Sequence, residues 1–137
     1  MSPALMPTRH SGFSLTEILV VLLVIAILVA IALPGYREHV MKNKRKDAID
    51  ALGRIQIEQE KRRGSASAYG TLADLGLPAV SADGHYTLSI ANLTATTYTA
   101  IATATGPQAE DKACATLEAT QAGPDIGNDQ KKACWAQ

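Results

Sequence analysis

The stretch Gly12-Phe13-Ser14-Leu15-Thr16-Glu17 runs directly into the apolar segment Ile18–Leu33, and the organisation of the chain follows from these residues. The twenty-one residues from Phe13 to Leu33 contain one charge, Glu17, and sixteen consecutive apolar residues follow it. A bilayer core is crossed by roughly 20 apolar residues of helix, so this segment is just long enough to span one. In an ordinary secretory signal the small-residue cleavage site follows the apolar run. Here the small residue, Gly12, precedes it, so a cut there would remove the basic leader and keep the helix.

These residues resemble the class III signal of type IV pilins and related pseudopilins. The resemblance is specific, because glycine, phenylalanine, glutamate and the apolar run must all coincide. It implies that Met1–Gly12 is a leader, that a prepilin peptidase cuts between Gly12 and Phe13, and that the new amino terminus of Phe13 is methylated. It also implies that Glu17 sets the register between subunits.

Length and charge allow one small domain beyond the apolar segment. The chain has 137 residues and a net charge of zero, and only six of its residues are aromatic (one Phe, four Tyr and one Trp). The core must therefore consist mostly of Ala, Leu, Ile and Val, and a small core of this kind tends to need a staple. Residues 13–63 carry nine Lys/Arg and six Asp/Glu, whereas residues 64–137 carry three and seven. This polarity would suit head-to-tail packing of copies along a fibre, although solvated faces explain it as well.

The charges that flank the apolar segment and the family resemblance predict opposite topologies. Only Arg9 precedes the apolar segment closely, and many basic residues follow it, which by the positive-inside rule would keep the carboxy-terminal part in the cytoplasm. The family resemblance instead places the leader in the cytoplasm, and a cysteine pair favours an oxidising compartment. We therefore expect an amino terminus in the cytoplasm and an exported domain.

The pattern after the apolar segment predicts a long helix. Pro34-Gly35 predicts a stop or a kink, because proline removes a helix hydrogen bond and clashes with the preceding turn. Tyr36–Arg63 contains good helix formers, and one amphipathic stripe recurs at three- and four-residue intervals. Its members are Met41, Ala48, Ile49, Leu52, Ile55, Gln56 and Gln59. We expect one helix from Phe13 to about Arg62 within residues 13–63, bent near Pro34 and roughly 75 Å long, so that about half of it projects.

The remainder, residues 64–137, predicts a small antiparallel sheet. After a connector over 64–84, the alternation in His85–Ala91 and the β-branched residues in Thr96–Thr103 predict a hairpin. Cys114–Thr120 predicts a third strand, Gly123–Asn128 a loop, and Lys132–Ala136 a short fourth strand. A helix followed by such a sheet is an α+β arrangement, and it resembles the pilin fold, with the long helix packed on the sheet by its carboxy-terminal half.

Glu17 is the first candidate functional residue. A carboxylate in a membrane helix costs about 2.5–3.5 kcal/mol at the bilayer centre and less near an end. Glu17 lies one turn from the mature amino terminus, where the helix dipole favours negative charge. It is therefore either a tolerated interfacial acid or, as the resemblance implies, the partner of a Phe13 amine in its own or a neighbouring subunit.

Cys114 and Cys134 are the only cysteines and enclose nineteen residues. Their spacing matches no zinc pattern, and no CxxC redox motif is present, which leaves a disulfide or two buried thiols. In the pilin family a bridge at this place bounds the variable carboxy-terminal region, so the resemblance implies a Cys114–Cys134 disulfide. The surrounding Asp111-Lys112-Ala113-Cys114 and Cys134-Trp135 also resemble small minor pilins of Gram-negative bacteria.

Other patterns are weaker. Asp125, Asn128 and Asp129 around Gly127 suggest calcium but lack the spacing of a calcium loop, and a polar turn is the better interpretation. The three histidines are scattered, and no nucleophile-elbow or phosphate-loop motif is present. We expect no catalytic, cofactor or metal site and therefore no enzyme.

Lys112, Lys131 and Lys132 lie beside the cysteines and are expected to come close together. Some competence pilins bind DNA through a basic surface in this region, and lysine–phosphate contacts give sequence-independent affinity. Several acidic residues nearby favour an ordinary solvated surface instead, so DNA is a possible but weakly supported partner.

Taken together, the sequence predicts a subunit of the type IV pilus, a minor pilin rather than the major one. The resemblance implies an inner-membrane protein that enters an extracellular filament and supports pilus assembly, twitching motility and adhesion. Its expected partners are other pilins, the prepilin peptidase and the inner-membrane assembly platform. The alternatives are a DNA-binding competence pilin and a pseudopilin of type II secretion.

Overall fold

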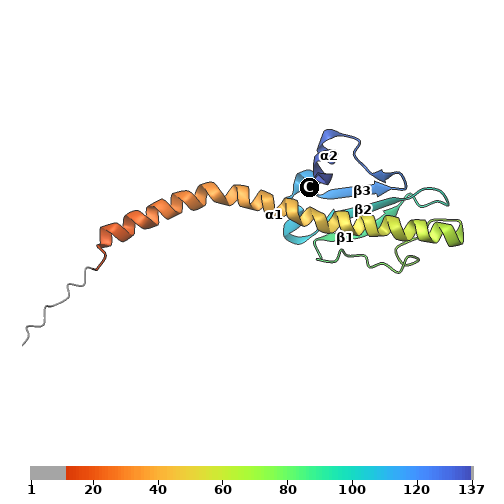
Figure 1. Ribbon diagram of the computed structural model, residues 1–137, viewed down its shortest axis with the longest axis horizontal. Coiled ribbons are helices and arrows are strands. Elements are labelled where there is room, and N and C mark those ends of the chain that lie inside the picture. Colours follow the sequence, from red (N-terminus) through yellow and green to blue (C-terminus); the bar gives the residue numbers. More distant parts are fainter. Residues whose placement is uncertain (1–11, 137) are drawn as a thin grey trace, which may run out of the picture. The chain divides into compact units, whose positions relative to one another are not determined.

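The structure is a computed structural model that describes residues 12–136, so most of the predicted leader lies outside the described residues. The chain divides into two units, Met1–Arg37 and Glu38–Gln137, which are described separately. The long helix α1 (Leu15–Ala66) contributes to both. It begins two residues later and ends four residues later than predicted, and it stays helical through Pro34, so the helix does not stop there. Figure 1 shows the elements in order.

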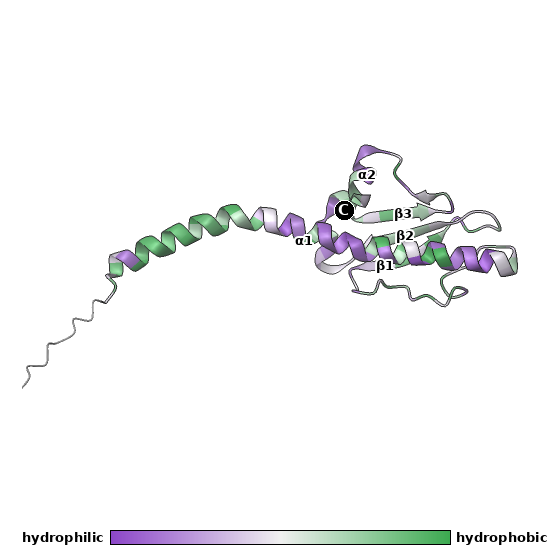
Figure 2. Ribbon diagram, viewed as in Figure 1, coloured by the Kyte–Doolittle hydropathy of each residue, from purple (hydrophilic) through white to green (hydrophobic). Residues whose placement is uncertain are grey.

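The first unit consists of the apolar part of α1. The backbone carbonyl of Ser14 accepts from the N–H groups of Glu17 and Ile18 (3.1 and 3.2 Å), which starts the helix and leaves Gly12 and Phe13 before it. Figure 2 shows the continuous hydrophobic colouring of this part of α1. Among the described residues, α1 is the one helix long and apolar enough to cross a membrane.

The second unit holds a four-stranded antiparallel sheet in the order β1-β2-β3-β4. The strands are β1 (Tyr86–Ala91), β2 (Thr99–Ala104), β3 (Thr116–Thr120) and β4 (Gly123–Pro124). The register sets Leu88 opposite Ala102 and Ala102 opposite Leu117. One long helix on a small antiparallel sheet is the α+β, pilin-like arrangement that the sequence predicts.

The core lies between the carboxy-terminal part of α1 and this sheet. The predicted stripe supplies the buried helix residues Ala48, Leu52, Ile55 and Gln59. The sheet supplies four alanines and three larger residues: Ala100, Ala102, Ala104, Ala119, Tyr86, Leu88 and Leu117. Tyr98, which directly precedes β2, completes this side of the core. Alanines on the sheet allow the helix backbone to come close, so this core is thin, and burial of each large side chain contributes roughly 1.5–3 kcal/mol.

Buried polar contacts fasten the connector and the 3₁₀ turns to α1. Gln59 donates to the carbonyl of Gly70 (2.7 Å) and accepts from its N–H (2.8 Å). The Asp47 carboxylate, which is buried, accepts from Ser81 Oγ (2.5 Å) and from the N–H groups of Asp83 and His85 (3.1 and 3.2 Å). Each contact satisfies backbone groups of the connector, whose only strand-like pairing in the described chain is the bridge of Val80 to Thr87.

A third polar contact joins α1 to the turns after β2. These are two 3₁₀ helices, η1 (Gly106–Glu110) and η2 (Lys112–Cys114). Arg45 donates twice to the Asp111 carboxylate, at 2.6 and 2.9 Å, and this hydrogen-bonded partner raises the pKa of the guanidinium. The buried Gln108 amide donates to the Met41 carbonyl and to Tyr86 Oη, both at 3.1 Å.

Several predicted boundaries are corrected. β1 begins at Tyr86 rather than His85. β2 begins at Thr99 rather than Thr96, because Thr94 Oγ1 accepts from the N–H groups of Thr96 and Thr97 and holds them in a turn. The third strand begins at Thr116, since residues 112–114 form η2, and the predicted loop Gly123–Asn128 contains the two-residue β4.

The predicted fourth strand Lys132–Ala136 is wrong, because this segment belongs to a helix, α2 (Asp129–Trp135). The side chain of Asn128 accepts from Lys131 N–H (2.8 Å), as a helix N-cap does. Asp129 in the first turn suits the helix dipole. An alternation over five residues is too short to separate a strand from a helix.

The disulfide Cys114–Cys134 ties α2 to η2, with the two Cα atoms 5.6 Å apart. Both cysteines are buried, and Gln130 also donates to the Ala113 carbonyl (2.9 Å). The bridge that the family resemblance implied is therefore present. A helix of seven residues is marginal by itself, so α2 depends on this link and on its cap.

Opening the bridge should destabilise the second unit and melt α2 first. Cys134→Ser should lower the free energy of unfolding by about 2–5 kcal/mol, since removing a native disulfide from a small domain typically has this cost. Thermal unfolding of the exported chain measures the loss, and thiol labelling of the native protein should find no free cysteine. Ala133→Ser, at the exposed neighbouring position, is the matched control and should unfold like the wild type. Two labelled thiols in the native wild type would contradict the expectation.

Candidate functional site

The amino-terminal residues that the resemblance singled out lie at the start of α1. Gly12 and Phe13 precede the helix, and the Phe13 side chain is 81% exposed. Glu17 lies in the first turn of α1, where free backbone N–H groups make a carboxylate favourable. Phe13 thus lies four residues before Glu17, just outside the helix. Cleavage after Gly12, methylation of Phe13 and registration by Glu17 remain predictions.

The apolar segment Ile18–Leu33 is exposed on every side in the single chain. Its large side chains are between 45% (Leu33) and 72% (Ile31) exposed. Soluble monomers rarely expose contiguous apolar patches beyond a few hundred Å². A helix that is hydrophobic all round needs a membrane or other helices around it.

Of the three lysines predicted to come close together (Lys112, Lys131 and Lys132), one already belongs to an ion pair. Lys131 binds the Asp125 carboxylate and lies 3.8 Å from Glu118. The hydrogen bond from Lys131 to Asp125 raises the pKa of Lys131 and lowers that of Asp125. The positive charge of Lys131 is therefore balanced within the fold. Lys112 and Lys132 are exposed, and neither belongs to an ion pair within residues 12–136.

Two of the three residues that suggested calcium, Asp125 and Asn128, have other partners within the fold. Asp125, which binds Lys131, also accepts a hydrogen bond from the N–H of Gly127 (3.1 Å). Asn128 caps α2. Within the described part of the chain, no group of three His, Cys, Asp or Glu side chains could hold a metal ion.

Sequence reasoning missed what the basic run Lys42–Lys46 does. Arg45 pairs with Asp111 and is nearly buried (13% exposed), whereas Lys42 is exposed and lies one helical turn before it. A signal was available, because Arg45 falls on the buried stripe between Met41 and Ala48 at helical spacing. A charged residue on a buried stripe predicts a buried partner.

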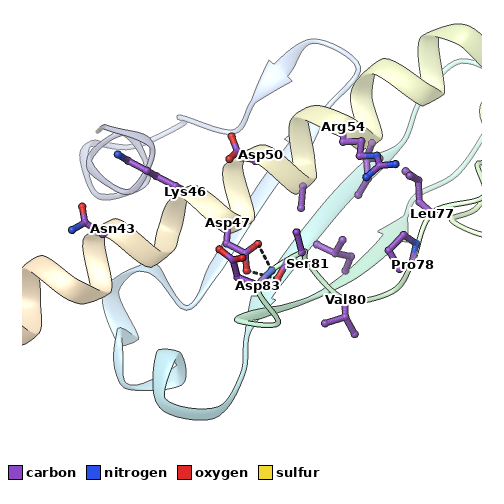
Figure 3. A pocket seen from close by; sticks show the side chains of 14 residues that line it. Asn43, Lys46, Asp47, Asp50, Arg54, Leu77, Pro78, Val80, Ser81 and Asp83 are labelled. Atoms are coloured by element: carbon purple, nitrogen blue, oxygen red, sulfur yellow. Dashed lines mark hydrogen bonds between the residues drawn. The ribbon is translucent and has the colours of Figure 1, made fainter.

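A cleft of about 500 Å³ was also not predicted. It lies between α1 and the connector residues 77–83, and Leu88 of β1 also lines it. Figure 3 shows its lining, with charged residues of α1 on one side and apolar residues of the connector on the other. Hydrophobic periodicity locates a buried stripe but not the space left beside it.

Two models of known protein families match the chain. A model of the prokaryotic N-terminal methylation motif matches residues 7–33. A second family model, described as type IV minor pilin ComP, DNA uptake sequence receptor, matches residues 34–118, which is more than half of the chain. The search of curated proteins finds no match. With its apolar amino-terminal helix, its pilin-like fold and these two matches, the chain belongs to the family of the type IV minor pilin ComP.

Proposed function

We propose that this minor pilin works by polymerisation and not by catalysis. It is made as a prepilin, cut after Gly12 by a prepilin peptidase and methylated on Phe13. The inner-membrane assembly platform then moves it into a filament with other pilins, where it supports assembly, twitching motility and adhesion. The observation that carries this proposal is the apolar surface of Ile18–Leu33, which the fold leaves uncovered.

A membrane and a bundle of pilin helices cover that surface in the same way. Before assembly the segment spans the inner membrane of a Gram-negative bacterium with its amino terminus in the cytoplasm. The disulfide supports export of the second unit, since such bonds persist in oxidising compartments. The disulfide and the match to a minor pilin family also favour this role over that of a type II secretion pseudopilin.

Glu17 sets the axial register in this proposal. Its carboxylate pairs with the amine of Phe13 from a neighbouring subunit, in a bundle core from which water is excluded. An unpaired carboxylate there is costly, so a subunit that is out of register loses both the pair and the hydration of the charge.

A second function, DNA binding, is favoured by the description of the matched family as a DNA uptake sequence receptor. In this chain the basic corner, which we define as Lys42, Lys112 and Lys132, is the surface that we propose for phosphate. Lys112 directly follows Asp111, whose bond to Arg45 brings it to the helix turn that carries Lys42. Lys112 and Lys132 each precede a bridged cysteine by two residues. The three lysines are exposed and belong to no ion pair among residues 12–136.

Gly12→Val should block processing. A Cβ at Gly12 meets no atom within 4 Å, so the substitution does not disturb the fold, and the loss should arise at the peptidase. The unprocessed protein should stay in the inner membrane. Mass spectrometry should find wild-type filament protein beginning at methylated Phe13. Ser14→Ala is the control and should be processed normally. An amino terminus at any other residue would contradict the proposal.

Glu17→Ala should leave insertion and cleavage intact and reduce incorporation into filaments. Breaking a buried ion pair costs about 3–5 kcal/mol, which corresponds to a roughly 100-fold or greater loss of incorporation. Quantitative immunoblotting of sheared filaments against the membrane fraction measures the ratio. Thr16→Ala changes the neighbouring residue without removing a charge and should be incorporated normally. Normal incorporation of Glu17→Ala would show that the carboxylate is merely tolerated.

DNA binding by the full chain in detergent should fall steeply with salt. Three phosphate contacts on duplex DNA predict a slope of log K against log salt of about −2.7, which is roughly a 40-fold loss between 50 and 200 mM. Alanine at Lys42, Lys112 or Lys132 should each make the slope shallower by about 0.9. Lys61→Ala is the matched control, since Lys61 is exposed but already paired with Glu58. Equal effects of all four substitutions would exclude the basic corner as the binding surface.

A further inference from the structure

The cleft beside α1, which we call the connector cleft, has a built apolar floor. The floor consists of side chains from α1, the connector and β1: Ala51, Ile55, Leu77, Pro78, Val80 and Leu88. Val80 is 46% exposed although it is hydrophobic. The volume of about 500 Å³ is enough for a branched aliphatic side chain and its flanking backbone. Filling the cleft would remove this apolar surface from water.

The wall of the cleft is held in place before anything binds. Asp47 fixes the connector through Ser81 Oγ and the N–H groups of Asp83 and His85, and Ser81 Oγ in turn accepts from Tyr86 N–H (3.0 Å). Figure 3 shows the bonds of Asp47 to Ser81 and Asp83. A preformed cleft requires little ordering on binding, which favours association.

Three charged residues of α1 also line the cleft. Lys46, Asp50 and Arg54 follow one another at four-residue spacing along α1, and none of them takes part in an ion pair within residues 12–136. In Figure 3 Arg54 lies at the end formed by Leu77 and Pro78, and Lys46 lies at the other end. A ligand for the Arg54 end would present an apolar side chain and a carboxylate.

The chain itself carries such a group at the other edge of its sheet. Ile126 is 53% exposed in the loop between β4 and α2, and the exposed Asp129 follows three residues later with no ion-pair partner in the described chain. The bond of Lys131 to Asp125 and the Asn128 cap hold this loop in shape. Because the sheet order is β1-β2-β3-β4, the cleft beside β1 and the loop after β4 belong to opposite edges.

We propose that the connector cleft of one copy binds the Ile126 loop of a second copy. Ile126 packs on Leu77, Pro78 and Val80, and Asp129 pairs with Arg54. The two surfaces differ, so the contact is head-to-tail and each copy can engage two neighbours, which gives an open row rather than a closed dimer. This inference rests on the proposed polymerisation and names one contact within it.

A photo-cross-linker in place of Ile126 tests the contact in the full-length chain, solubilised from membranes in detergent. Irradiation should give a cross-linked dimer whose adduct maps to residues 77–83 or 43–55. The same cross-linker at Ile57, which is similarly exposed (59%) but outside the cleft, is the matched control and should give at least five-fold less dimer. Equal yields at both positions, or adducts mapped elsewhere, would overturn the proposal.

The charge pair gives an independent arm of the test. Arg54→Asp and Asp129→Arg should each lower the dimer yield roughly five-fold, as expected for a pair at a partly exposed rim, and the combined exchange should restore it. Failure of the exchange to restore the yield would overturn the Arg54–Asp129 pair. Detergent covers the apolar segment, so these yields do not depend on filament assembly. Loss of polymerisation would appear instead as failed incorporation with the cross-link intact.

Discussion

An apolar helical surface that the fold does not cover is the constraint on which everything else depends. Ile18–Leu33 is exposed along its whole length in the single chain. The surface is therefore stable only in a lipid bilayer or among other helices. A lipid bilayer and a bundle of helices are equally apolar environments for this surface. In the proposed register, the carboxylate of Glu17 distinguishes them, because a neighbouring subunit supplies its counter-charge.

The second unit meets a different demand, since it must remain folded with few large apolar side chains. Its sheet packs mostly alanine against the helix, and polar contacts at three positions along α1 hold the loops in place. Arg45 holds the turns after β2, Asp47 holds the end of the connector, and Gln59 holds its beginning. Each contact is strong because it is shielded from water. Removing one partner would be costly, because the other partner would then be buried without a hydrogen bond. The disulfide adds the same kind of fastening to α2.

Features that depend on local periodicity could be predicted from the sequence. The stripe from Ala48 to Gln59, the hairpin and the start of the long helix agree with the structure to within a few residues. The distant partners of single polar side chains could not, because the stripe marks Arg45 as half-buried but does not name Asp111, and Asp47 looks like a surface charge in a polar run. The strand predicted at Lys132–Ala136 is part of α2, because the Asn128 cap outweighs a short alternation. The cleft has no sequence signal, because it is a space between segments thirty residues apart.

The two surfaces proposed for DNA and for a second copy meet on α2. Asp129 and Lys132 are three residues apart and so lie one helical turn from each other. In a free copy the carboxylate of Asp129 repels a phosphate that approaches Lys132. When Asp129 pairs with Arg54 of a neighbour, that repulsion is compensated, and the basic corner gains affinity for phosphate. By linkage, DNA bound at the corner then strengthens the contact between copies by the same factor. Both proposals therefore favour a receptor that binds DNA better as part of a row of subunits than as a single chain.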